Sequence, residues 1–291
     1  MYIYTSIITT LTPILLASLG GLLTLQAGVL NISQEGSMLV AAFFAILGSY
    51  MFSSFWMGLL FAFLAALIFN LIYAFFSVTL KANIWVVGMS LNILASSLTI
   101  LLLKSIFGVK GSFTSDKIQK IPIFHMGSRW LFFIDNFSLV VWLAAGALIL
   151  TYFIDSKTVF GFHIKAAGKN YKALNSSGIS TDKIRYYTII INALFTSLAG
   201  SYLSIGYLSL FNKDMTAGRG WIAVAAVIFG DGDFKMTVLA TLIFGIMEAV
   251  GILLQNYGIN SNLTMTLPYL IIIFTLIYRG VKTSLKIKNP S

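Results

Sequence analysis

Long apolar stretches recur from one end of this chain to the other, and they constrain its fold more than any other feature. A helix that crosses a bilayer needs about 20 mostly apolar residues, and about nine stretches bounded by polar residues approach or reach that length. The 291 residues include only 19 basic and 9 acidic side chains, too few to cover a soluble protein of this size. The sequence therefore excludes an ordinary soluble enzyme and predicts an all-α, polytopic bundle of membrane-spanning helices.

The apolar stretches predict about nine spans in a single transmembrane domain over residues 1–291. We place these spans at Ile7–Leu25, Ser37–Trp56, Gly58–Leu80, Ile84–Phe107, Phe137–Ile154, Tyr186–Leu208, Ala217–Gly230, Phe234–Leu254 and Asn262–Tyr278. The seventh covers only about 20 Å of a hydrocarbon core about 30 Å thick. We expect either a full span in a protected setting or a broken, partly re-entrant helix, which is tolerated inside protein or beside a cavity.

Basic residues predict the orientation of these spans, because they are in excess on the cytoplasmic side of membrane proteins. Six of them lie within residues 155–185 and four within residues 279–288. Both groups can face the cytoplasm if the N-terminus and the loop 108–136 lie outside and the C-terminus lies inside. The first apolar stretch lacks a preceding basic region, so we expect it to remain as a span.

Several kinds of chemistry are excluded by the residues that the chain lacks. It contains no cysteine, so it has no disulfide and no thiolate metal site. Its two histidines, His125 and His163, lie far apart, which disfavours a histidine metal site. The pattern of a phosphate-binding P-loop is absent as well. We therefore expect no cofactor in this chain, and if ATP drives it, ATP and Mg²⁺ bind to a separate subunit.

A polar segment, GVLNISQEGSM at residues 28–38, interrupts the apolar pattern between the first two spans. Its glycines bracket Asn31, Ser33 and Glu35. Backbone exposed at such a helix break can coordinate a polar solute during transport. The alternative is a short cytoplasmic turn in which Glu35 lies near a helix N-terminus, where an anion is favoured.

The basic segment 155–185 contains a helical pattern with two different faces. Its apolar face carries Ile164, Ala167, Tyr171 and Leu174. Its basic face carries Lys165, Lys169 and Lys172. This pattern predicts a short amphipathic helix parallel to the membrane on its inner side. The helix either rests on anionic lipid or docks a cytosolic partner.

Two of the charged residues at or within the predicted spans are candidates for function, Arg219 and Glu248. Glu248 stands in the middle of the eighth span, where a carboxylate is costly unless it is paired, protonated or facing water. It is either a functional group or a residue satisfied by a neighbouring helix. Arg219 begins the seventh span between two glycines, where an interface anchor is favoured over a substrate ligand. The lone amides Asn70, Asn92 and Asn192 are favoured as hydrogen-bond partners between helices.

Residues 28–38 resemble the signature near the start of bacterial ABC importer permeases of the ribose, branched-chain amino-acid and nucleoside class. The form Asn-Ile-x-x-Glu-Gly-x-Met is most similar to the nucleoside branch. Residues 202–208 and 215–230 and the triplet Leu267-Pro268-Tyr269 are similar to nucleoside-type permeases as well. Two features depart from the family. Lys172, Asn175 and Ser176 stand where a second glycine or an acid is common, and Asp231-Gly232-Asp233 lacks the usual Asn-Pro.

The resemblance implies a transport subunit of the bacterial inner membrane, similar to the shorter permease of a nucleoside-type pair and without catalysis of its own. Its implied partners are a cytosolic ATPase subunit, a second paralogous permease and an extracytoplasmic substrate-binding lipoprotein, which the loop 108–136 would face. A coupling helix would contact the ATPase. Its implied residues are Lys165, Ala166, Ala167, Gly168, Asn170, Ala173, Gly178 and Ile179.

The solute and its path are predicted from polar residues near the breaks and inside the spans. We expect the path to include Asn31, Ser33, Glu35, Asn92, Thr216, Arg219 and Glu248. Nucleosides would use such amides and hydroxyls together with aromatic side chains, although a sugar or an amino acid could use the same groups. A proton-coupled secondary transporter that uses Glu248 is the alternative mechanism.

Overall fold

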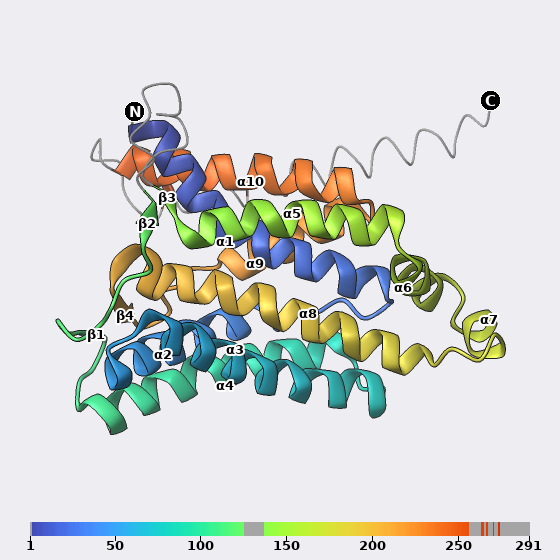
Figure 1. Cartoon of the computed structure of the whole chain (residues 1–291), viewed down its shortest axis with the longest axis horizontal. Coiled ribbons are helices and arrows are strands. Elements are labelled where there is room, and N and C mark those ends of the chain that lie inside the picture. Colours follow the sequence, from blue (N-terminus) through green and yellow to red (C-terminus); the bar gives the residue numbers. More distant parts are fainter. Residues whose placement is uncertain are drawn as a thin grey trace.

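The computed structural model describes residues 2–124 and 137–255, together with residues 263, 264, 266, 270 and 273. The long helices lie along one axis, and the connections between them gather at the two ends of the bundle (Figure 1). The helices are α1 (Tyr2–Gln26), α2 (Gln34–Phe52), α3 (Phe55–Ala74), α4 (Ile84–Phe107), α5 (Leu139–Lys157), α6 (Val159–Lys169), α7 (Tyr171–Ser176), α8 (Thr181–Ser201), α9 (Arg219–Gly230) and α10 (Phe234–Gln255). Two π-helical turns, η1 (Phe75–Thr79) and η2 (Tyr202–Leu208), continue α3 and α8.

Seven helices in the described part of the chain are long and apolar enough to cross a membrane. They are α1, α2, α3 with η1, α4, α5, α8 with η2, and α10. The predicted polytopic helical fold is therefore confirmed, whereas the number of nine spans stays a prediction. The ninth predicted span, Asn262–Tyr278, lies almost entirely outside the described residues.

Several predicted span boundaries were wrong, among them the start of the first span, since α1 begins at Tyr2 and not at Ile7. Local geometry explains two of the others. The second span was predicted to reach Trp56, but α2 ends at Phe52 because Ser53 adopts a left-handed conformation (φ 47°). The sixth was predicted from Tyr186, but α8 begins five residues earlier at Thr181. Ser180 caps it by accepting a hydrogen bond from the backbone N–H of Lys183 (3.4 Å). The first turn of α8 is polar, so hydropathy alone does not reveal it.

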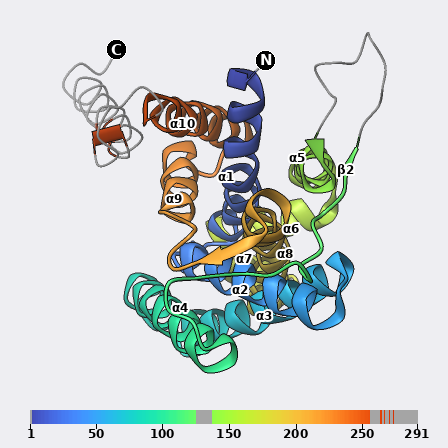
Figure 2. The same cartoon turned by 90° about the vertical axis from the view of Figure 1, so that its left-hand side faces the viewer.

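α1 lies at the centre of the bundle, and the end-on view shows α5, α9 and α10 around it (Figure 2). The outer helices present large apolar side chains on the surface. Ile68 on α3, Ile93 on α4 and Ile149 on α5 are 62%, 70% and 69% exposed. A water-soluble protein rarely exposes so much apolar surface, whereas the interior of a bilayer requires it.

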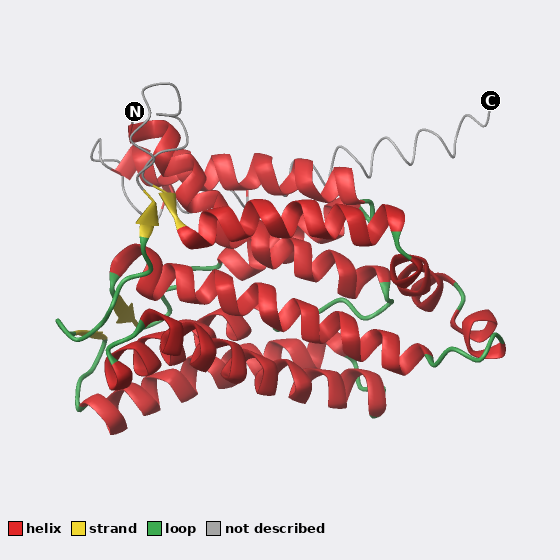
Figure 3. Ribbon diagram, viewed as in Figure 1, coloured by secondary structure: helices red, strands yellow, loops and turns green. Residues whose placement is uncertain are grey.

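The two long connections lie at opposite ends of the bundle. At one end, β1 (Ser112–Thr114) pairs with β4 (Leu210–Asn212), and β2 (Ile123–Phe124) pairs with β3 (Phe137–Ser138), both antiparallel. α6 and α7 lie at the other end (Figure 3). The described part of the loop 108–136 is thus separated from the basic segment by the length of the bundle. Which end faces the cytoplasm stays a prediction.

The predicted amphipathic helix in the basic segment is two helices instead of one. Asn170 separates α6 from α7, and its Oδ1 accepts a hydrogen bond from the backbone N–H of Ala173 (3.1 Å), which caps α7. Ile164 and Leu174 are buried as predicted, but Tyr171 is 51% exposed. The break at Asn170 rotates Tyr171 out of the buried face. That face packs against α1 and α8, not against lipid.

Candidate functional site at the meeting point of two broken helices

Two segments without helical structure bring two helix N-termini together inside the bundle. Residues 27–33 connect the end of α1 to α2, and residues 213–218 connect β4 to α9. Figure 1 shows α9 in the middle of the bundle's length. With 12 residues, α9 covers about 18 Å. The shortness of the seventh span is therefore confirmed, and the choice between a full span and a broken helix stays a prediction.

Glu35, in the first turn of α2, binds the N-terminus of α9 with both carboxylate oxygens. Its Oε1 accepts hydrogen bonds from Thr216 Oγ1 (2.6 Å) and from the backbone N–H of Gly218 (2.9 Å). Its Oε2 accepts one from the backbone N–H of Gly220 (2.7 Å). The first N–H groups of a helix are unpaired and carry partial positive charge, so an anion is stabilised there. We call these four residues the junction.

The glycines of the junction allow this close approach. A Cβ atom on Gly220 would lie 2.5 Å from the Cα and 2.6 Å from the backbone N of Glu35, closer than atoms can pack. Gly218 has a φ of 82°, in the left-handed region that glycine adopts without strain. The two glycines that flank Arg219 in the sequence are therefore needed to seat Glu35.

Arg219 and Glu248 form an ion pair next to the junction. Arg219 Nη2 lies 3.3 Å from Glu248 Oε1, and the two side chains are only 15% and 12% exposed. Arg219 Nη1 also lies 3.4 Å from the carbonyl oxygen of Thr216. The sequence singled out both charged residues separately, and the structure pairs them. Glu248 thus has a neighbouring helix that satisfies it.

A cavity of about 380 Å³ lies beside this ion pair. It is lined by Ala217, Arg219, Glu248, Gly251, Ile252, Gln255 and Thr264. Its volume falls within the range of small-molecule sites, about 300–1,000 Å³. A mixed lining of charged, amide and apolar groups fits a polar organic solute.

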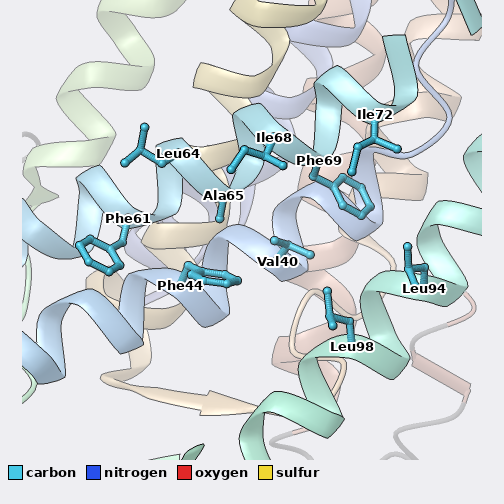
Figure 4. Close-up of a pocket in the computed structure, with 10 residues that line it drawn as sticks. All are labelled: Val40, Phe44, Phe61, Leu64, Ala65, Ile68, Phe69, Ile72, Leu94 and Leu98. Carbon is cyan, nitrogen blue, oxygen red and sulfur yellow. The ribbon is translucent and has the colours of Figure 1, made fainter. Parts of the chain in front are cut away.

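A second hollow, between α2, α3 and α4, has a different character (Figure 4). Its volume is about 370 Å³, and its lining side chains, among them Phe44, Ile68 and Leu98, are all aliphatic or aromatic. A polar solute there would lose hydrogen bonds to water without replacement. This hollow therefore does not provide a path for such a solute.

Asn92 on α4 caps the start of α2. Its Oδ1 accepts a hydrogen bond from the backbone N–H of Gly36 (2.7 Å), and its Nδ2 donates one to the carbonyl oxygen of Ile32 (3.0 Å). It therefore satisfies one donor of the helix terminus that carries Glu35. This arrangement matches the expectation of an amide that joins two helices.

Asn31 and Ser33 are fully buried and hold the segment 27–33 from within. Asn31 Oδ1 accepts hydrogen bonds from the backbone N–H (2.9 Å) and the Oγ (2.7 Å) of Ser33. Asn31 Nδ2 donates to Asn70 Oδ1 (2.7 Å), and Asn192 Nδ2 donates to the same oxygen (3.2 Å). Asn70 Nδ2 in turn donates to Ser37 Oγ (2.6 Å). A buried polar network of this kind fixes the segment in one conformation.

α6 lies directly against the start of segment 27–33. A Cβ atom on Gly168 would lie 2.1 Å from the carbonyl oxygen of Gln26, and one on Gly28 would lie 3.1 Å from the Cα of Gly168. Gly28 also has a φ of 80°. The backbones therefore meet without side chains between them.

Four residues from four parts of the chain join at this end of the bundle, and we call them the end cluster. Gln26 Nε2 donates hydrogen bonds to Asp155 Oδ1 (2.7 Å) and to the carbonyl oxygen of Gly232 (2.8 Å). Lys165 Nζ lies 2.9 Å from Asp155 Oδ1. The cluster connects α1, α5, α6 and the turn between α9 and α10. Sequence analysis missed Gln26 and Asp155, because polar residues at span ends are common.

The residues implied for coupling divide into two groups. Ala167 is buried, and Lys165, Ala166 and Ile179 are half-buried. The exposed group consists of Gly168, Asn170, Ala173 and Gly178. Sequence analysis also missed Val159 and Phe162 of α6, which are 69% and 64% exposed. An aromatic residue opposite the buried face of a short helix was the available signal.

The family model described as "Branched-chain amino acid transport system / permease component" matches residues 3–276, nearly the whole chain. The chain belongs to this permease family. It is therefore a multi-pass membrane protein and an ABC transporter permease, a transport component and not an enzyme. The permease resemblance of the sequence is confirmed.

Curated relatives extend over most of this permease. The guanosine ABC transporter permease protein NupQ of Bacillus subtilis is 31% identical and covers 91% of this chain and 87% of its own. The nucleoside ABC transporter permease protein NupC of Lactococcus lactis is 28% identical with the same coverage. The glucose ABC transporter permease protein TsgB13 of Haloferax volcanii is 25% identical and covers 93% of this chain and 75% of its own.

A solved structure supports the fold. PsaBC from Streptococcus pneumoniae in complex with Fab matches with a TM-score of 0.57 at 13% identity. The match covers 98% of this permease and 94% of that chain. At this identity the likeness concerns the fold alone.

Proposed function

We propose that this permease carries a nucleoside inward across the membrane as one subunit of an ABC importer. The observation that carries the proposal is the cluster of Glu35, Arg219 and Glu248 inside an apolar bundle, beside a cavity of about 380 Å³. Charged groups at such a depth are costly and mark solute pathways. Two of the relatives are named for guanosine or nucleosides and one for glucose. An uncharged, polyhydroxylated solute is common to all three names.

The predicted path residues take two roles in this proposal. Glu35, Thr216, Arg219 and Glu248 line or border the path, and Asn92 holds the helix start that carries Glu35. Asn31 and Ser33 would hold the path residues in place without contacting the solute, because they are fully buried and hydrogen-bonded to each other. Hydroxyl and amide groups of a nucleoside would exchange hydrogen bonds with the first group.

ATP and Mg²⁺ would bind to a separate cytosolic subunit, which docks on α6. Val159 and Phe162 supply exposed apolar surface for this contact, and Lys169 supplies exposed charge. Gly168 of α6 contacts Gly28, so α6 packs directly against segment 27–33, which precedes Glu35 in the chain. Movement of the ATPase would therefore reach the path through backbone contacts.

Two further partners complete the proposed importer. A second paralogous permease would pair with this chain and enclose the path from the other side. An extracytoplasmic substrate-binding lipoprotein would dock at the end of the bundle that carries β1–β4. Amino acids are the competing substrate class, because the family model is named for them.

The test is uptake of radiolabelled guanosine by the importer reconstituted with all its subunits. We expect saturable, vanadate-sensitive uptake that unlabelled uridine reduces strongly and unlabelled leucine does not. Reduction by glucose or leucine with no effect of nucleosides would overturn the nucleoside assignment. Uptake by this chain alone, collapsed by an uncoupler, would instead support proton-coupled transport through Glu248.

Matched variants separate the path from the rest of the protein. Arg219→Met removes the cation of the buried ion pair, and we expect guanosine uptake to fall at least tenfold. Lys157→Met removes an exposed lysine at the end of α5, and we expect uptake close to that of the unmodified importer. Equal uptake in both variants would contradict a role for the ion pair.

A further inference from the structure

We propose that Glu35 determines specificity: its carboxylate fills the anion site at the N-terminus of α9, so the pathway does not accept anionic solutes there. This proposal rests on the proposed function, since it concerns the solute that the permease carries. It goes further by assigning the exclusion of anions to one residue.

The donors at the start of α9 form a site that suits a carboxylate. Thr216 Oγ1 and the backbone N–H groups of Gly218 and Gly220 all point to one place, at 2.6–2.9 Å from the oxygens bound there. In transporters with broken helices, such a terminus binds the anionic group of the substrate. In this chain, the carboxylate comes from the protein itself.

Glu35 uses the site completely and is tethered to it. Both of its oxygens accept hydrogen bonds from the start of α9, and the backbone of Glu35 packs closely against Gly220, so the carboxylate is held at these donors. An anionic solute would have to displace a carboxylate held permanently at a high effective concentration. It would also meet the negative charge of that displaced group.

The neighbouring cation does not provide a substitute site. Arg219 is paired with Glu248 at 3.3 Å, and the pair is largely buried. The junction and the ion pair together hold two carboxylates and one guanidinium, so their net charge repels a carboxylate or a phosphate. A nucleotide is therefore repelled here, and an amino acid finds no free site for its carboxylate, whereas a nucleoside or a sugar carries no charge to be repelled.

Glu35 is also placed where a solute could meet it. The neighbouring residues Asn31, Ser33 and Gln34 are fully buried, but Glu35 is only half-buried. Its hydrogen-bond partners Thr216, Gly218 and Gly220 alternate along the chain with Ala217 and Arg219, which line the 380 Å³ cavity.

The test asks whether a small anion can replace the side chain. In Glu35→Ala, formate has room to occupy the donors of α9, and we expect it to raise the Tm of the purified importer by about 2–4 °C at saturation. Formamide, which has the same shape without charge, should have no effect. The unmodified importer should not respond to formate, because its site is filled.

Asp233→Ala is the matched control, because Asp233 also accepts a hydrogen bond from a helix N-terminus, that of Met236 in α10 (2.8 Å), but is exposed to water. Its variant should show no formate effect, since water and salt screen that site. Glu35→Ser, which leaves similar space, serves if Glu35→Ala cannot be purified. The proposal would be overturned if formate did not raise the Tm of whichever Glu35 variant can be purified. It would also be overturned if formate raised the Tm of the unmodified importer by the same amount.

The proposal and the function on which it rests can fail separately. The Tm measurement with formate requires no knowledge of the solute, whereas guanosine uptake by the unmodified importer tests the function. A formate effect without guanosine uptake retains the anion site and rejects the nucleoside. Guanosine uptake without a formate effect retains the nucleoside and rejects the anion site.

Discussion

The junction and the end cluster each use one carboxylate to join parts of the chain that are far apart in sequence, but the two differ in their surroundings. Glu35 is bound by uncharged donors, a hydroxyl and two backbone N–H groups, inside the bundle. Asp155 is bound by an amide and by Lys165, whose side chain is 34% exposed. The junction therefore depends on fixed backbone geometry, and the end cluster on a partly hydrated ion pair that salt can weaken.

The largest expected effect comes from breaking the ion pair next to the junction. Glu248→Leu leaves Arg219 buried without a counter-charge, which costs about 3–5 kcal/mol of the free energy of unfolding. The double variant Arg219→Leu/Glu248→Leu should lose less than Glu248→Leu alone, because no charge is left unpaired. Denaturation of the purified permease measures both. A double variant that loses the sum of the two single variants would contradict the pairing.

Gly220→Ala should have the next largest effect, since its Cβ would overlap the backbone of Glu35. We expect a loss of about 1–3 kcal/mol from overpacking together with loss of guanosine uptake. Gly146→Ala in α5 is the control, because a Cβ there meets nothing within 4 Å in the described structure. That variant should be neutral or gain up to about 1 kcal/mol from helix propensity. Similar Tm values for the two alanine variants would refute the close contact.

A change in the end cluster should affect the coupling of ATP hydrolysis to uptake more than it affects the free energy of unfolding. Gln26→Leu removes two hydrogen bonds and costs about 1–3 kcal/mol, while the ATPase partner should still hydrolyse ATP. We expect fewer guanosine molecules to enter per ATP hydrolysed, because Gln26 joins the turn after α9 to Asp155 of α5, which pairs with Lys165 of α6. Gln119→Leu, an exposed residue at the opposite end of the bundle, should leave this ratio unchanged. An unchanged ratio in Gln26→Leu would show that the end cluster is structural only.

The smallest effect is expected for Asp182→Asn. Asp182 lies 4.0 Å from Arg185, but its side chain is 60% exposed. Exposed pairs of this kind contribute less than about 1 kcal/mol, so the Tm and guanosine uptake should stay within error. A loss comparable to that of Gln26→Leu would mean that the surface of α8 participates in docking.

Much of the fold was predictable because hydropathy reports on each helix separately. The positions of the spans followed from apolar runs. Arg219 and Glu248 were singled out because charge is rare in such runs, and Glu35 because it lies in a polar segment between two of them. The polar first turn of α8 and the break at Asn170 were not predictable from hydropathy, since capping side chains determine them. Local capping reverses the exposure of Tyr171 within a pattern that otherwise fits a helix.

The partners of the polar residues could not be predicted from the sequence. One alternative placed Glu35 near the N-terminus of a helix, and it lies in the first turn of α2. Its hydrogen-bond partners, however, lie in and just before the first turn of α9, 181–185 residues later. The pairing of Arg219 with Glu248 and the network of Asn31, Asn70 and Asn192 are likewise long-range. Such contacts depend on how the helices pack, and one sequence contains no record of those distances.

The contact between Gly28 and Gly168 has a consequence for how force travels through the protein. Side chains between two helices can absorb a small displacement, because their torsion angles can change before the backbones move. At these two glycines no side chain lies between the two segments, and backbone contacts backbone. A displacement of α6 of a few tenths of an ångström must therefore move the start of segment 27–33 by a similar amount. The segment behaves as a stiff lever arm, with the carboxylate of Glu35 just beyond its far end.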